Sequence, residues 1–206
     1  MSDTVLLILS ALIGYLLGSV PFGLVLTRLA GLGDIRQIGS GNIGATNVLR
    51  TGRKDLALLT LIMDSGKAAL AAGIAYYCVP EESVGDTAAL IAGTAGVIGH
   101  NFPVWLKFKG GKGVASTLGM MLATCWPVGL SACLTWLLTA VMFRYSSLAA
   151  MVALVASPFY AFYFADVEYA SFYGFLAVLS LIRHRANIVR LLHGEETKIK
   201  LKKKAD

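Results

Sequence analysis

The stretch GVASTLGMMLATCWPVGLSACLTWLLTAVMF, residues 113–143, determines how many times the chain crosses a membrane. Its 31 residues include no charged side chain. As one α-helix it would be about 46 Å long, which is too long for one comfortable crossing of a hydrocarbon core of about 30 Å but short for two. A break at Trp126–Pro127 would instead divide the stretch into a hairpin of two helices.

The placement of Lys and Arg distinguishes these two possibilities, because cytoplasmic loops collect cationic residues. With a hairpin, 17 of the 18 Lys and Arg residues fall on one side of the membrane, and the other side carries only acidic charges. With a single span, Arg144 and the eight cations from Arg183 onward would change sides. The hairpin is therefore the prediction. The cations occupy 28–54, 107–112, 144 and 183–206, and the opposite side holds Asp3, Glu81, Glu82, Asp86, Asp166 and Glu168.

The overall composition agrees with a membrane protein. Hydrophobic residues make up 56% of the 206 residues and charged residues 15%, whereas a soluble domain carries about 25% charged residues. Several uncharged runs are long enough to span a bilayer, which excludes a soluble domain, a secreted disulfide scaffold and a disordered tail. Because only Asp3 precedes the first run, which is also too long for a signal peptide, we expect that run to be a retained helix.

We therefore predict an all-α polytopic membrane protein with seven transmembrane helices, its N-terminus outside and its C-terminus in the cytoplasm. It forms one domain over residues 1–206, with a basic cytoplasmic tail from about 194 to 206. The three cysteines are expected to be buried small hydrophobic residues. Neither they nor the His and acidic residues have metal-ligand spacing, so we expect no metal and no cofactor. The predicted helices are Thr4–Leu26, Leu56–Val79, Thr87–Leu106, Val114–Trp126, Val128–Phe143, Ser146–Ala165 and Tyr169–Ile182.

The remaining cation, Lys67, lies inside the second predicted helix, three residues after Asp64. The two side chains can pair, and ionisable residues at membrane depth are functional candidates. An internal ion pair that tethers neighbouring helices explains the pattern equally well. Both interpretations stay open at this point.

The segment Gly39-Ser-Gly-Asn-Ile-Gly-Ala-Thr-Asn-Val-Leu-Arg50 has the features of an oxyanion-binding loop. Its glycines permit tight turns that direct N–H groups at an anion, and Arg50 offers a bidentate fork for phosphate. A dinucleotide-binding loop is rejected although G-x-G-x-x-G is present, because a membrane helix rather than a β-strand precedes it. The neutral donors of the segment are Ser40, Asn42, Thr46 and Asn47.

Two further segments on the same predicted face suit anions. Gly110, Gly111 and Gly113 flank Lys112, so its ammonium is open to an oxyanion, and the positive end of the helix that follows points to the same place. In Arg183-His-Arg-Ala-Asn-Ile-Val-Arg190, the side chains three residues apart at His184 and Asn187 share a helix face. The flanking arginines favour a neutral His184 that is able to accept a proton.

Three polar segments thus predict a site for two phosphate-bearing ligands beside a lipid chain. The terminal lysines, Lys198 to Lys204, are expected to contact anionic lipid headgroups, and no nucleic acid is expected. The competing function is a membrane transporter of phosphate or an organophosphate, for which Lys67 with Asp64 is the best support. A non-enzymatic lipid-binding or scaffold protein would leave the glycines around Lys112 unexplained.

These segments together resemble the bacterial acyl-phosphate:glycerol-3-phosphate acyltransferases, the PlsY family. The resemblance covers nearly the whole chain and is carried by GSGNIGATNVLR at 39–50, GHNFPVWLKFKGGKGVAS at 99–116 and RHRANIVRLLHGEE at 183–196, with a weaker match, RYSSL, at 144–148. It implies seven membrane helices in the bacterial inner membrane, with a site that faces the cytoplasm. It also implies transfer of a fatty acyl group from acyl phosphate to the 1-hydroxyl of glycerol 3-phosphate, which gives lysophosphatidate and phosphate.

The resemblance also implies roles for individual residues. Glycerol 3-phosphate would be bound by Ser40, Arg50, Lys112, His184 and Asn187. Acyl phosphate would be held by Gly110, Gly111 and Gly113 with Asn42, Thr46 and Asn47, and Ser146 joins the substrate-binding set. We expect direct attack by the glycerol hydroxyl, stabilised by Lys112 and loop N–H groups, with the proton passing to His184 or to a substrate phosphate oxygen. The oligomeric state is left open.

Overall fold

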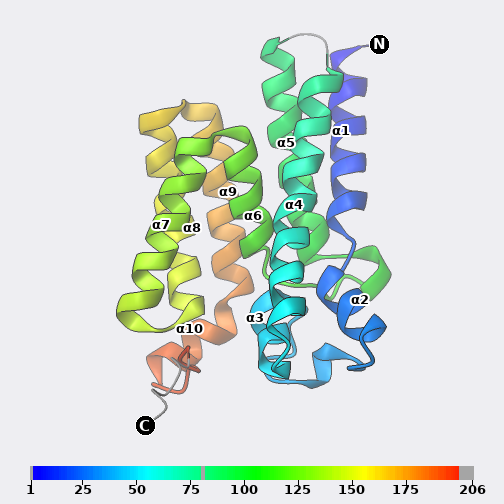
Figure 1. The fold of residues 1–206 in the computed structure, drawn as a ribbon. Coiled ribbons are helices and arrows are strands. Elements are labelled where there is room, and N and C mark those ends of the chain that lie inside the picture. The colour runs from blue at the N-terminus through cyan, green and yellow to red at the C-terminus, as the bar shows by residue number, and fades with distance from the viewer. Residues whose placement is uncertain (1, 80–81, 200–206) are drawn as a thin grey trace.

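The computed structural model describes residues 2–79 and 82–199, and the regular structure in these ranges is helical (Figure 1). The predicted outer acid Glu81 and the tail lysines Lys200 to Lys204 lie outside the described residues. The α-helices are α1 (Asp3–Gly18), α2 (Phe22–Leu29), α3 (Ala45–Val48), α4 (Lys54–Cys78), α5 (Glu82–Asn101), α6 (Val114–Thr124), α7 (Trp126–Phe143), α8 (Ser146–Phe164), α9 (Val167–Arg183) and α10 (Arg185–Leu192). Short 3₁₀ turns are η1 (Ile35–Gln37), η2 (Leu49–Thr51) and η3 (Val104–Leu106).

Five segments of the described chain are long and apolar enough to cross a bilayer, which confirms an all-helical membrane architecture. They are Asp3–Leu29, Lys54–Cys78, Val84–Leu106, Trp126–Phe143 and Ser146–Phe164. Two of the seven predicted spans are shorter: α6 has 11 residues, about 16 Å, and α9 has 17, about 26 Å. The glycine loop before α6 therefore leads into a helix that covers only part of a membrane thickness.

The break predicted within residues 113–143 is confirmed. One residue, Cys125, separates α6 from α7 and has φ −151° and ψ 88°. Pro127 then lies in the first turn of α7, where its missing N–H costs no helical hydrogen bond. The two helices approach closely, because a Cβ added at Gly129 would lie 2.5 Å from the backbone nitrogen of Leu122. The stretch is a hairpin and not one long helix.

Two other predicted helices are interrupted by proline. The helix expected over 4–26 divides into α1 and α2 at Pro21, which has no N–H to donate into the preceding turn. The helix expected over 87–106 begins earlier, at residue 82, and its regular part stops at Asn101, two residues before Pro103. The short turn η3 follows this second proline.

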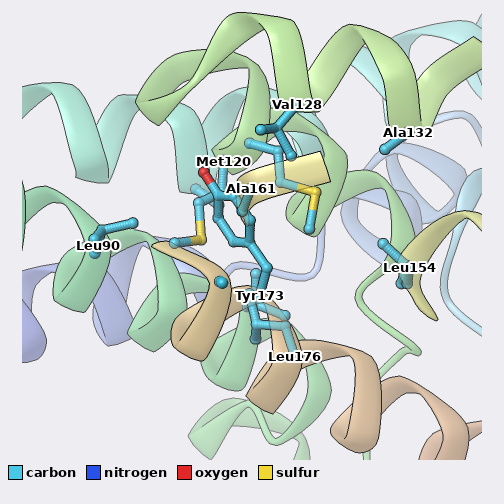
Figure 2. Close-up of a cluster of buried hydrophobic side chains, with 12 residues drawn as sticks. Leu90, Met120, Val128, Ala132, Leu154, Ala161, Tyr173 and Leu176 are labelled. Atoms are coloured by element: carbon cyan, nitrogen blue, oxygen red, sulfur yellow. The ribbon is translucent and has the colours of Figure 1, made fainter. Parts of the chain in front are cut away.

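The helices form two groups, with α6 between them (Figure 1). On one side α1 packs against α5 through small residues, so that Gly14 and Gly18 touch the backbone at Ala92 and Gly96. Small residues let membrane helices approach closely where no hydrophobic driving force joins them. Figure 2 shows the main apolar cluster, where Met120 of α6 and Tyr173 of α9 are fully buried. This packing holds α6, and the loop that precedes it, between the two helix groups.

The three cysteines are free thiols, and none of them is fully buried as expected. Cys125 and Cys133 are half-buried, whereas Cys78, the last residue of α4, is exposed and not buried. Large apolar side chains such as Leu138 and Val141 of α7 are also exposed, which suits a surface that faces lipid.

Candidate active site

The three predicted polar segments meet at one end of the helix bundle, the end at which α3 and α10 lie (Figure 1). Arg183, at the end of α9, donates to the carbonyls of Gly110 and Gly111 in the loop before α6. A cavity of about 510 Å³ is lined by Arg183 and Gly110 together with Gly41 of the first segment. Segments separated by more than 140 residues of sequence thus contribute to one cavity.

Asn47 organises the first segment. Its Nδ2 donates to the carbonyl oxygens of Ile35, Ile38 and Asn42 at 2.8–3.0 Å, and its side chain is buried. Its Oδ1 accepts from the backbone N–H of Ser40 at 3.0 Å and from the Ser40 hydroxyl at 3.3 Å. Because both ends of the amide are occupied, Asn47 shapes the loop, and the structure gives its side chain no direct approach to a ligand.

Ser40 and Arg50 are both exposed on this loop. Gly39, which precedes Ser40, has φ +58°, and a Cβ at this position would lie 2.7 Å from Arg50 Cδ. The partner of the Ser40 hydroxyl is an amide oxygen and not a base that could activate it, so the geometry supports anion binding rather than nucleophilic attack. Thr46 is exposed, and Asn42 has a buried Oδ1 for which the described residues supply no hydrogen-bond donor.

The glycine loop before α6 is held from both sides. The N–H of Gly111 donates to the His100 carbonyl at 3.0 Å, and the N–H of Gly110 donates to the Asn101 carbonyl at 3.2 Å. Arg183 binds the carbonyls of the same two glycines at 2.9–3.1 Å. These two N–H groups are therefore used within the protein. The N–H groups of the first turn of α6, which have no intrahelical partner, are the better oxyanion donors.

Lys112 extends from this loop toward α10. Its Nζ donates to Asn187 Oδ1. Burial lowers the pKa of Lys112 to about 8, although the nearby Glu196 carboxylate opposes this effect. The charge of Arg50 also lowers the pKa of Lys112. With a pKa of about 8, the ammonium form makes up about nine-tenths of the population at pH 7.

His184 lies buried between α9 and α10, on the same side as Lys112. Its Nδ1 is 2.8 Å from the Ser180 carbonyl oxygen, to which it donates, and this leaves Nε2 as an acceptor. Burial and then the charge of Lys112 lower the pKa of His184 to about 4. This direction agrees with the predicted neutral imidazole. Of the two flanking arginines expected to cause it, Arg183 contributes less than burial and Lys112.

Glu196 is the residue that sequence reasoning missed. Its Oε1 accepts from Asn187 Nδ2 at 2.8 Å and from the Ser147 hydroxyl at 3.0 Å, and its Oε2 accepts from Arg190 Nε at 2.8 Å. It therefore orients the amide that Lys112 contacts. The signal in the sequence is the acid pair that interrupts the cationic C-terminal stretch.

The α7–α8 turn lies against the chain end that follows Glu196. The Ile199 N–H donates to the Arg144 carbonyl, and the Arg144 guanidinium donates to the Ile199 carbonyl. The Lys198 ammonium lies 5.5 Å from the centre of the Tyr145 ring. The described part of the predicted basic tail thus packs on the protein. Ser146 is half-buried at the start of α8, next to the serine that contacts Glu196.

The structure brings the predicted residues into two groups. One consists of Ser40, Asn42, Thr46 and Arg50 around Asn47, and the other consists of Lys112, His184 and Asn187 beside the glycine loop. Residues 2–79 and 82–199 include no group of three or more His, Cys, Asp or Glu side chains that could hold a metal ion.

Known proteins with similar sequences and folds are glycerol-3-phosphate acyltransferases. The family model described as glycerol-3-phosphate acyltransferase matches residues 8–194. A glycerol-3-phosphate acyltransferase of Rhodospirillum rubrum is 64% identical over 95% of this chain and 92% of its own length, and one of Paramagnetospirillum magneticum is 62% identical over 97% of each. Two crystal structures of PlsY, an integral membrane glycerol 3-phosphate acyltransferase, are also similar. The glycerol 3-phosphate form has a TM-score of 0.87 at 37% identity over 94% of this chain and 96% of that one. The lysophosphatidic acid form has a TM-score of 0.85 at 36% identity, with 94% and 95% covered.

Proposed function

The chain belongs to the glycerol-3-phosphate acyltransferase family, and from this premise we propose that its acyl donor is acyl phosphate and its acceptor is the 1-hydroxyl of glycerol 3-phosphate. The products are 1-acylglycerol 3-phosphate and inorganic phosphate, at the first acylation of phospholipid synthesis. The observation that carries the proposal is the convergence of two oxyanion-binding groups. Lys112 and Asn187 with Ser40 and Arg50 form one, and the N–H groups at the start of α6 form the other.

Glycerol 3-phosphate is assigned to the cations and neutral donors that surround Lys112. Arg50 offers a bidentate fork to its phosphate, Ser40 and Asn187 offer neutral groups, and Lys112 adds a compact charge. Acyl phosphate is assigned to the loop Gly110–Gly113 and the first turn of α6, with Asn42 and Thr46 nearby. Its acyl chain then extends among apolar helices, where a lipid tail is soluble.

In the chemical step the 1-hydroxyl oxygen attacks the acyl carbonyl carbon. A new ester C–O bond forms, the carbonyl carbon–oxygen bond to phosphate breaks, and the phosphate leaves with the bonding electrons. Lys112 and the N–H groups at the start of α6 stabilise the developing oxyanion and the leaving group. A mixed anhydride is already activated, so no acyl-enzyme intermediate is required.

The proton of the hydroxyl is assigned to the leaving phosphate, with His184 as the group that orients the hydroxyl. A catalytic base works best with a pKa near the operating pH, and His184 has a pKa of about 4. Its free Nε2 is nevertheless a good hydrogen-bond acceptor for the 1-hydroxyl. The proposal therefore favours a substrate phosphate oxygen over His184 as the proton acceptor.

Radiolabelled glycerol 3-phosphate tests the proposed function. Purified protein with acyl phosphate should form labelled lysophosphatidate, and replacing acyl phosphate with acyl-CoA or an acyl carrier protein thioester should abolish the product. Product formed equally well from a thioester would exclude acyl phosphate as the specific donor. Uptake of label into vesicles without any lipid product would instead favour the transporter.

For the membrane arrangement, we propose that the chain forms one domain that crosses the bacterial inner membrane seven times. Its N-terminus lies outside, and its site faces the cytoplasm. The clustering of the loop cations at the end of the bundle that holds α3 and α10 supports it (Figure 1). In a cysteine-free background, a membrane-impermeant thiol reagent added to intact cells should label Asp3→Cys and spare Lys109→Cys. The reverse pattern would overturn the orientation.

A further inference from the structure

A buried polar cluster lies where α4, α5 and the break between α1 and α2 meet. Lys67 Nζ donates to Asp64 Oδ1 at 2.9 Å and to the carbonyl of Val20 at 3.0 Å, and it lies 2.9 Å from His100 Nδ1. The side chains of Asp64, Lys67 and His100 are each 5% exposed or less. None of these three side chains is used in the chemical step proposed above.

The three contacts of Lys67 fix the orientation of the His100 ring. An ammonium has three protons and no lone pair, so it can only donate. His100 Nδ1 must therefore accept a hydrogen bond from Lys67, and this nitrogen is the one that faces Lys67. The opposite ring nitrogen, Nε2, then points away from the ion pair.

On its other side the His100 ring lies against the glycine loop. A Cβ added at Gly111 would lie 2.0 Å from His100 Nε2, and the three nearest atoms to that position all belong to the ring. The His100 carbonyl also accepts the Gly111 N–H at 3.0 Å. The loop thus rests on His100 from one side, and Arg183 holds its carbonyls from the other.

We propose that the Asp64–Lys67 ion pair positions the acyl-phosphate loop through His100. The pair fixes the imidazole ring, the ring supports Gly111, and this support sets the position at which the loop receives the phosphate of the acyl donor. The inference rests on the proposed function, because it concerns the site assigned to acyl phosphate. Asp64, Lys67 and His100 are positioning residues and do not touch substrate. A helix tether alone would not require the ring of His100 to contact the loop.

Removing both charges together tests the chain of contacts without leaving a lone buried charge. In the double variant Asp64→Asn/Lys67→Met, we expect KM for acyl phosphate to rise about tenfold while KM for glycerol 3-phosphate and kcat change less than threefold. His100→Leu should give the same separation. Combining all three substitutions should still give about tenfold and not a hundredfold, because residues that act through one contact are not additive.

A suppressor experiment tests the contact between the ring and the loop by a second route. Gly111→Ala places a methyl group against the His100 ring and should raise KM for acyl phosphate. Adding His100→Ala removes the clash but also the support, so the double variant should have the KM of His100→Ala alone, which is lower than that of Gly111→Ala alone. The control is Tyr160→Phe, which removes the 2.7 Å hydrogen bond to Thr135 away from the loop and should leave both KM values unchanged.

The outcomes separate this inference from the function on which it rests. Wild-type protein that makes no lipid from acyl phosphate overturns both. Active wild-type protein with equal rises in the two KM values, additive effects, or no suppression of Gly111→Ala overturns only the positioning role.

Discussion

Glu196→Gln is the substitution that examines the charge balance of the site most closely. Glutamine keeps the shape of the side chain and an oxygen that can accept from Asn187 and Ser147. It removes the negative charge and turns an NH₂ group toward Arg190 Nε, which is also a donor. The expected consequence is a lower pKa for Lys112, because the Glu196 charge is the largest influence that raises it.

The size of this effect follows from the arrangement of charges. Two charges on either side of one amide, near a protein surface, interact by about 1–3 kcal/mol. An interaction of about 1.4 kcal/mol changes a protonation equilibrium tenfold. From a starting pKa of about 8, the protonated fraction of Lys112 at pH 7.5 falls from about three quarters to about one quarter. The rate should therefore fall about threefold at pH 7.5 and by less at pH 6.5.

The assay is kcat/KM for glycerol 3-phosphate measured from pH 6 to 9. Activity needs the ammonium form, so it decreases as the pH rises through the pKa of Lys112, and the variant should show this decrease at lower pH. Glu195→Gln is the matched control, since Glu195 is an exposed neighbouring acid. An alkaline limb at the same pH in wild type and Glu196→Gln would refute the reasoning about Lys112.

Three further substitutions test other parts of the site. Gly39→Ala should lower kcat/KM for glycerol 3-phosphate at least tenfold, because a Cβ there crowds the arginine of the same loop. Gly33→Ala has a similar positive φ but open space and should change kcat/KM less than threefold. Arg183→Lys loses the fork that holds the glycine loop and should raise KM for acyl phosphate several-fold, whereas the exposed Arg185→Lys should not. His184→Gln, which keeps an acceptor, should retain kcat within about tenfold, and His184→Ala should lose more. A loss of a hundredfold or more in the glutamine variant would make His184 the base.

The features predictable from sequence are those set by composition and short-range chemistry. The hairpin at residues 113–143 followed from charge placement, and the structure divides the chain within two residues of the expected point. The glycine-rich segments were recognisable because loops that bind oxyanions need those residue types locally. The direction of the His184 pKa shift was predictable, but its main cause was not, since burial depends on how α9 and α10 pack.

The contacts that sequence could not supply join residues far apart in the chain. The side chain of Asn47 could donate to a ligand, yet its amide nitrogen donates to three backbone carbonyls instead. The partners of Glu196 lie on α8 and α10, and the ion pair of Lys67 reaches His100 across 33 residues. Hydrophobic periodicity and residue spacing predict the position of each helix separately. They do not predict which buried side chains of different helices are in contact.

Attack of the 1-hydroxyl on the acyl carbon, rather than on phosphorus, is the central claim, and the fate of a heavy oxygen isotope tests it. Purified protein is given acyl phosphate and glycerol 3-phosphate labelled at the 1-hydroxyl oxygen, and both products are analysed by mass spectrometry. The account predicts equal amounts of lysophosphatidate and phosphate, with the label in the ester of the lipid and none in the released phosphate. Label in a new phosphate ester of glycerol together with free fatty acid, or phosphate released without lipid, would contradict it.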